Sequence, residues 1–147
     1  MPAPFNSPRR VVSGTFGKVM IDGDYFAQIY KFQAKTGLNK ADIPMANNFV
    51  VGKKRMSATN TGSLGMYKID SSMARKVGLQ IQEGLDPNFT AIMELNDPDA
   101  HGPERLAFYG VSFDDMTWAD WEFNNPSKVE CPFTFERCEP LDLMPDD

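Results

Sequence analysis

The pair Asp22-Gly23 lies between two apolar runs and predicts a tight β-hairpin. Both residue types accept the positive φ angles that a two-residue type I′ turn requires. A hairpin from about Gly14 to Ala34 would carry apolar pairs on both faces: Met20 opposite Tyr25 and Phe16 opposite Ile29 on one, Val19 opposite Phe26 on the other. An ordinary hairpin leaves one face to water, so a second layer is expected to cover this one.

Further short apolar runs, separated by turn signals, predict five more strands. The run at 63–69 alternates apolar and polar residues, and the segment 89–95 ends at the turn signal Asn96-Asp97-Pro98-Asp99. The remaining predicted strands cover 104–113, 116–123 and 129–138. With the hairpin, these make seven short strands.

One segment changes its period and predicts an amphipathic helix. Met73, Val77 and Ile81 recur every four residues, and Ser71 or Ser72 can cap the start. Gly84 and the following Asp86-Pro87 end the helix. The sequence therefore predicts a mainly β protein: an antiparallel β-sandwich or barrel with one flanking α-helix, in a single domain covering residues 1–147.

Two segments show no period. Residues 1–13 hold three prolines and predict an extended arm. Residues 37–62 are polar and glycine-rich and predict a long loop, which in a small domain is usually functional or reaches elsewhere. The apolar residues within it would be unfavourable in water: Ile43, Met45, Phe49, Val50 and Val51.

Charge is distributed unevenly along the chain. Residues 1–80 carry a net charge of +8 and residues 81–147 a net charge of −13, which together give −5. One interpretation is an ordinary solvated surface with uneven charge. The other is a particle with a basic and an acidic side, suited to head-to-tail packing of identical copies.

The sequence predicts no catalytic, cofactor or metal site. The single histidine, His101, lies in a turn, and no glycine-rich phosphate loop or nucleophile elbow is present. Acid pairs such as Asp114-Asp115 lie at turns, where aspartate is favoured for backbone reasons. Cys131 and Cys138 are seven residues apart, on opposite faces of one predicted strand, which favours two reduced thiols over a disulfide or a zinc site. No secretory signal or membrane-spanning run is recognised, so synthesis in the cytoplasm is expected.

Five segments occur in an order and spacing that resemble a known family. They read GKVMIDGDYFAQIYKFQAK, GKKRMSATNTGSLGMYKIDS, GLDPNFT, LNDPDAHGPERLAFYGVSFD and ECPFTFE. From Gly14 to Leu141 the chain resembles the tail tube proteins of contractile-tailed bacteriophages and of PBSX-type defective prophages. It departs from them in its proline-rich start and in a longer stretch from Ala41 to Val51, both of which concern contacts between rings.

The resemblance implies a structural, non-enzymatic subunit. Members of the family form six-membered rings whose strands join in an inner β-barrel, and the rings stack into a hollow tube through which DNA passes. The implied partners are other copies of the chain, the sheath, the baseplate, the tape measure and the tail terminator, without cofactor or membrane. The implied location is the virion tail, after assembly in the host cytoplasm.

The resemblance also assigns expected roles to residues. The 37–62 loop becomes an arm between subunits, with candidate contacts at Ile43, Met45, Phe49, Val50, Val51, Lys53, Lys54 and Arg55. A basic lumen would retain DNA, whereas an acidic one repels it. The candidate lumen-facing acids lie in the second half of the chain: Glu94, Asp97, Asp99, Asp114, Asp115, Asp120 and Glu122.

Two other functions stay open at this point. The tube could belong to a tailocin or a type VI-like secretion device, which share the fold and carry no genome. A monomeric β-barrel that binds a small ligand, or that catalyses a reaction, would instead show convergent polar groups in its core, and the sequence indicates none.

Overall fold

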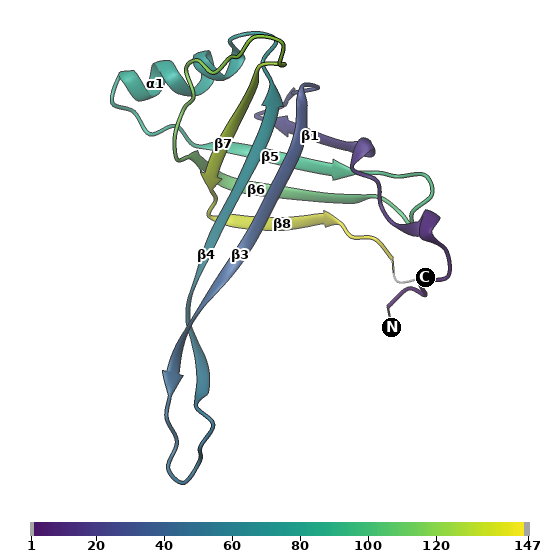
Figure 1. The fold of residues 1–147 in the computed structure, drawn as a ribbon, viewed down its shortest axis with the longest axis vertical. Helices are drawn as coiled ribbons and strands as arrows, with labels where there is room; N and C mark the ends of the chain where they lie inside the picture. The colour runs from purple at the N-terminus through teal and green to yellow at the C-terminus, as the bar shows by residue number, and fades with distance from the viewer. Residues whose placement is uncertain (1, 146–147) are drawn as a thin grey trace.

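The computed structural model describes residues 2–145, and its strands form two antiparallel sheets that cross (Figure 1). Sheet A contains β1 (Gly17–Ile21), β2 (Asp24–Tyr25), β5 (Phe89–Leu95), most of β6 (Glu104–Phe113) and β8 (Arg137–Asp142). Sheet B contains β3 (Ile29–Ile43), β4 (Gly52–Tyr67), β7 (Lys128–Thr134) and the end of β6. The mainly antiparallel β fold is therefore confirmed, with eight strands in place of the seven predicted.

Strand β6 connects the two sheets because it bends at Gly110. Residues 105–109 pair with β8, whereas Ser112 and Phe113 pair with β7. Gly110 has a φ of 68°, and a Cβ atom there would lie 2.7 Å from the Glu136 side chain, so the bend favours glycine.

The hydrophobic core lies between the sheets. In β7, Val129, Cys131 and Phe133 are buried, whereas Lys128 and Glu130 are exposed, as the alternation of a strand requires. The Phe133 ring lies at the centre of an aromatic group, with centroid distances of 5.6 Å to Phe32 and 6.2 Å to Phe113. This core holds sheet B to sheet A and leaves the other face of sheet B uncovered.

The predicted hairpin is confirmed from its turn as far as Val19 and Phe26, where the Phe26 N–H donates to the Val19 carbonyl (3.2 Å), and it is wrong beyond them. Asp22 and Gly23 have φ angles of 51° and 86°, and Met20 pairs with Tyr25. Phe16 does not lie opposite Ile29, because β2 has only two residues and the chain then enters β3 of the other sheet. Val19 and Ile21 point into the core, so the chain itself covers this face of the hairpin.

The prediction of a loop over 37–62 is wrong. Strands β3 and β4 pair from Lys31 opposite Gly65 to Ile43 opposite Gly52, and residues 44–51 connect them. Polar side chains replace hydrophobic alternation here: the Asn39 amide donates to the Ser57 hydroxyl (3.0 Å) and to the Thr59 hydroxyl (3.1 Å). Both faces of this part are wet, so no apolar period marks it in the sequence.

The strand predicted over 116–123 is also absent, and the last predicted strand is divided into β7 and β8. Residues 116–127 form an irregular loop between β6 and β7. Its Trp118 ring packs against Gly78, where a Cβ atom would lie 2.5 Å from the ring. Of the other strand predictions, 89–95 and 104–113 coincide with β5 and β6, and 63–69 falls on the end of β4, which stops at Tyr67.

The predicted helix is present as η3 (Ala74–Gly78, a π-helix) followed by α1 (Leu79–Gln82). Met73 and Val77 are buried, but Ile81 is not, because π-helical turns shift the phase of the residues that follow. The start is capped by Asp70, whose carboxylate accepts from the Ser72 N–H (3.0 Å), and not by a serine side chain. Gly84 (φ 81°) ends it as predicted. Among the described residues, no helix is long and apolar enough to span a membrane.

Candidate assembly interface

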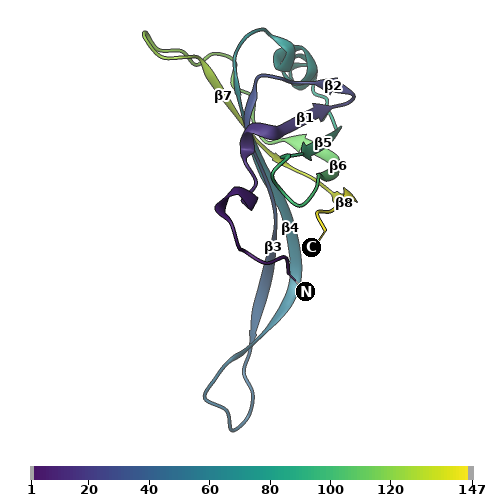
Figure 2. The ribbon, with the colours of Figure 1, turned by 90° about the vertical axis from the view of Figure 1, so that its right-hand side faces the viewer.

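The β3–β4 hairpin extends well beyond the rest of the molecule, as Figures 1 and 2 show. We call its outer part, residues 37–59, the arm. No residue of the arm is buried, and Phe49 at its tip is 107% exposed. The exposed large apolar residues of the arm are Leu38, Ile43, Met45, Phe49, Val50, Val51 and Met56. Such an exposed apolar group marks an interaction surface.

The arm is also basic. It carries Lys40, Lys53, Lys54 and Arg55 against a single acid, Asp42, which pairs with Lys53. All eight residues that the sequence suggested as subunit contacts lie on the arm, five in or next to the tip and three on β4. The structure thus brings these residues together; their contacts with another subunit stay a prediction.

A free sheet edge runs along β3. This strand pairs with β4 alone within the part of the chain that the structure describes, so one side of its backbone has no strand partner. An open groove of about 340 Å³ follows this edge between β1 and β3, and its apolar lining includes Val19, Ile29 and Phe32. A long unpaired edge of this kind is a template for adding a strand from another chain.

The exposed face of sheet B is polar and of mixed charge. The Tyr30 and Tyr67 rings pack at 4.8 Å, and the Lys128 ammonium lies over both of them, 5.5 and 5.7 Å from the centroids. Lys31 lies 4.0 Å from the Glu130 carboxylate on the neighbouring part of the sheet. Side chains of Gln33, Lys35, Thr61 and Ser63 share this face by strand alternation.

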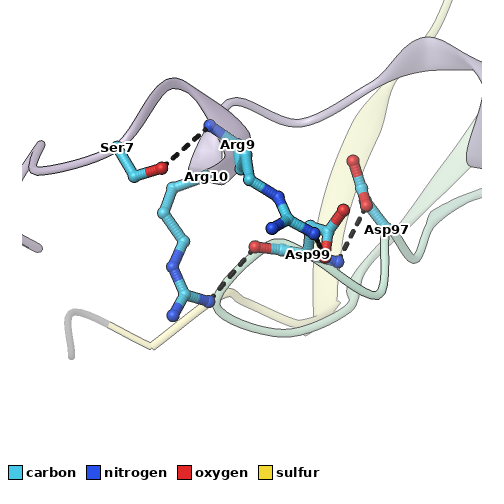
Figure 3. Close-up of polar contacts among 5 residues, drawn as sticks. All are labelled: Ser7, Arg9, Arg10, Asp97 and Asp99. Carbon is cyan, nitrogen blue, oxygen red and sulfur yellow. Dashed lines mark hydrogen bonds and ion pairs between the residues drawn. The ribbon is translucent and has the colours of Figure 1, made fainter.

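Asp97 is not a lumen-facing acid, because its side chain is used inside the subunit (Figure 3). It is 5% exposed, and its carboxylate accepts from the backbone N–H groups of Ser13 and Asp99, both at 2.9 Å. The prediction for Asp97 is therefore wrong. The Asp-Pro-Asp turn signal at this site could have suggested such a backbone role.

This turn also fixes the N-terminal segment. The Arg9 guanidinium lies 3.6 Å from the Asp99 carboxylate, and Arg10 donates to the Asp99 carbonyl (3.2 Å). The segment predicted as an extended arm forms one short turn, η1 (Pro8–Arg10), and leads into a second, η2 (Gly14–Phe16); both lie beside the β5–β6 connection. Residue 1 of that prediction lies outside the described residues.

The other candidate acids are not gathered on one surface. Glu94 lies on β5 of sheet A, directly opposite Lys18 on β1 and Arg105 on β6 in the strand register. Asp114 and Asp115 directly follow β6, next to sheet B. Asp120 and Glu122 belong to the 116–127 loop, and Asp99 pairs with the N-terminal segment.

The cysteines lie apart. Cys131 is buried in β7, and Cys138 is exposed in β8, both as free thiols. Burial raises the pKa of the Cys131 thiol to about 11, so this thiol stays protonated and unreactive at neutral pH. Among residues 2–145, no group of three or more His, Cys, Asp or Glu side chains could hold a metal ion.

Comparison with known proteins agrees with this geometry. A profile of the phage tail tube protein family matches residues 5–142. The phage-like element PBSX protein XkdM of Bacillus subtilis (strain 168) is 31% identical over 130 residues, which are 87% of this chain and 88% of XkdM.

Two solved assemblies contain a chain of similar fold. One is the sheath–tube complex of an extracellular contractile injection system (PVC) in the extended state, with a TM-score of 0.68 and 8% identity over 97% of this chain and 93% of that one. The other is the sheath/tube terminator of the same kind of system, with a TM-score of 0.69 and 8% identity over 97% and 98% of the two chains. The family profile and the XkdM relative together show that the chain belongs to the phage tail tube proteins, the structural, non-enzymatic tube subunits of phage and phage-like tails.

Proposed function

We propose that this chain forms six-membered rings that stack into a hollow tube inside a contractile sheath, and that DNA passes through the tube during ejection. The observation that carries the proposal is the combination of a free β3 edge with an exposed arm that the subunit itself leaves uncovered. A monomer with both features exposes strand edge and apolar surface, which is costly unless other copies cover them.

Within a ring, the free edge of β3 pairs with sheet B of the next copy. Strand β7 pairs with β6 only at Ser112 and Phe113, and the Pro132 carbonyl accepts from the Asp114 N–H (2.9 Å), so β7 has no strand partner on that side from Lys128 to Cys131. The two open edges lie on opposite sides of sheet B, which is the arrangement that a closed ring of identical copies requires. The groove beside β3 would receive residues of the neighbouring copy.

The exposed face of sheet B then lines the lumen. Sheet A and the helical segment lie on its other face, and a ring has more room outside than inside, so the bulky side faces outward. The lining is mixed, because its lysines, Lys31, Lys35 and Lys128, are offset by Glu130 on the face and by Asp114 and Asp115 at its margin. A mixed lining limits retention of DNA, since few cations are clustered.

This arrangement shortens the list of candidate lumen-facing acids. Asp114 and Asp115 stay candidates for lumen-facing acids in this arrangement, whereas Glu94 and Asp99 lie on sheet A and its turns. Screening limits the effect of any such charge to DNA near the wall, because the Debye length is about 8 Å at physiological salt.

A second candidate function is a tube that carries no genome, as in a tailocin or an injection device. The fold similarity to an extracellular contractile injection system favours this alternative. Nuclease-protected DNA in purified particles containing this chain would support the phage tail, and its absence the second candidate. The sheath, baseplate, tape measure and terminator are proposed partners in both cases, with assembly in the host cytoplasm.

Negative-stain microscopy of the purified full-length chain tests the proposal directly. We expect stacked rings or tubes with six-fold top views at high protein concentration. A dispersed monomer under all conditions, including in the presence of sheath and baseplate proteins from the same locus, would contradict self-assembly and favour a ligand-binding barrel.

A further inference from the structure

The subunit is elongated, and two unrelated surfaces lie at its opposite ends. Strand β4 runs from Gly52, next to the arm tip, to Tyr67, which pairs with Lys128 just after the 116–127 loop. Its 16 residues span about 50 Å at ~3.3 Å per residue. Figures 1 and 2 show the arm tip at one end of the molecule and the loop that precedes β7 at the other.

The 116–127 loop presents a fixed aromatic surface. Trp121 and Phe123 are 71% and 83% exposed, and their rings meet edge to face at 5.8 Å. Two hydrogen bonds fix the backbone of the loop. The Trp118 carbonyl accepts from the Lys68 ammonium (3.2 Å), and the Asp120 carbonyl accepts from the Ser127 hydroxyl (2.8 Å). A loop with a fixed backbone therefore exposes two large aromatic side chains to solvent.

The two ends are complementary in charge as well as in polarity. The 116–127 loop carries two acids, Asp120 and Glu122, and no lysine or arginine of its own. The arm carries four cations against one acid. Opposite charges around two apolar contact surfaces favour one docking orientation and speed the association of the two copies.

We propose that the arm of one copy docks on the 116–127 loop of the next copy along the tube. The apolar tip around Phe49 and Val50 packs on Trp121 and Phe123, and the cations of β4, Lys53, Lys54 and Arg55, face Asp120 and Glu122. This inference rests on the proposed tube and names the surface on which its arm is received. It also assigns Asp120 and Glu122 to contacts between rings, away from the lumen.

A second copy is the occupant that the geometry favours. Because the two surfaces lie about 50 Å apart on β4, they cannot meet within one subunit. A contact between different patches on two copies is heterologous, and when its rotation does not close, it produces an open stack. The contact thus supplies the axial polarity that a tube needs, whereas the free β3 edge supplies the contact around the ring.

Charge reversal tests the pairing. We expect K53E/K54E/R55E on the arm, and D120K/E122K on the loop, each to lower the fraction of protein in sedimenting tubes at least ten-fold. Combining the two sets should restore tubes, because the charges are again opposite. A control matched to the loop set, E136K/E139K at the start of β8, makes the same charge change elsewhere and should leave assembly unchanged.

Cysteine cross-linking tests contact without requiring tubes. In a C138S background, which removes the exposed native thiol, F49C/W121C should give a ladder of disulfide-linked multimers under oxidation. The pair F49C/E139C is the control and should give no ladder. Cross-linking no stronger than the control overturns the docking inference.

The outcomes separate the two proposals. Six-fold tubes whose formation neither charge set affects would overturn the docking and leave the tube function intact. If no rings or tubes form, the proposed function fails its own test, and the cross-linking result still decides whether arm and loop meet.

Discussion

At the scale of single residues, a two-residue turn positions the first strand of sheet A. Asp22 and Gly23 both have positive φ angles, and Asp22 also bonds to Thr90 of strand β5. Its N–H donates to the Thr90 carbonyl, and its carboxylate accepts from the Thr90 N–H, both at 2.9 Å. The turn therefore sets the register of β1 against β5 as well as against β2.

Gly23→Val should destabilise the fold through the backbone alone. A Cβ atom at this position meets nothing within 4 Å, so the cost comes from the φ of 86°, which a β-branched residue adopts with strain. We expect a loss of about 1–2 kcal/mol in the free energy of unfolding, measured by urea denaturation. Asp22→Asn is the control, because asparagine tolerates positive φ and keeps an acceptor; equal stability of Gly23→Val and wild type would contradict the turn.

Asp97 is the second residue whose role follows from its contacts. Asp97→Ala leaves the N–H groups of Ser13 and Asp99 without their acceptor and should cost about 1–3 kcal/mol. Trypsin should then cleave faster after Arg9 and Arg10, because the N-terminal segment loses its attachment. Asp99→Asn removes only an exposed ion pair and should change stability by less than about 1 kcal/mol. Similar cleavage rates in the two variants would argue against the proposed attachment.

At the scale of elements, the helical segment offers a matched pair of positions. Val77 is 1% exposed, whereas Ile81, one predicted turn later, is 42% exposed. Val77→Asp buries an unpaired carboxylate and should cost several kcal/mol, visible as a large fall in the melting temperature. Ile81→Asp should have little effect. Comparable losses in both variants would mean that the helical segment packs through its whole length.

Elements with one buried face could be predicted from the sequence, and those with both faces exposed to solvent could not. Strands β5 and β6 follow predicted bounds because their apolar residues, such as Ala91 and Phe108, enter the core. The arm has no such residues, so its pairing depends on polar side chains and on continuity with the buried end of β4. The aromatic residues at 116–123 mimic a strand pattern, yet they serve an exposed loop.

The residues of the candidate interface could also be predicted only where their pattern in the sequence is distinctive. The candidate contact residues around Phe49 could be proposed because apolar side chains in an otherwise polar segment are conspicuous in a sequence. The acids could not be sorted, because a buried acceptor such as Asp97 and an exposed acid such as Glu122 look alike without their neighbours. The proposed receptor of the arm was missed for a related reason: Trp121 and Phe123 were interpreted as part of a strand.

At the scale of the whole molecule, forming the arm costs the free subunit free energy. It orders backbone and exposes apolar side chains without contributing a buried residue to the core. Its stability as a hairpin comes from pairing that continues out of sheet B. Assembly is the step in which this exposed surface becomes buried, so removing the arm should separate folding from assembly.

Replacing residues 39–57 by Asn-Gly makes this separation testable. Leu38 and Ala58 are directly paired, and Asn-Gly supplies the two-residue type I′ turn that can join them. We expect the shortened chain to unfold at nearly the wild-type temperature, because no core contact is lost and the shorter connection costs less closure entropy. Tubes should be absent by negative stain, although the free β3 edge could still support single rings. Wild-type tubes from the shortened chain would show that the arm is dispensable, whereas a large fall in melting temperature would show that it stabilises the subunit itself.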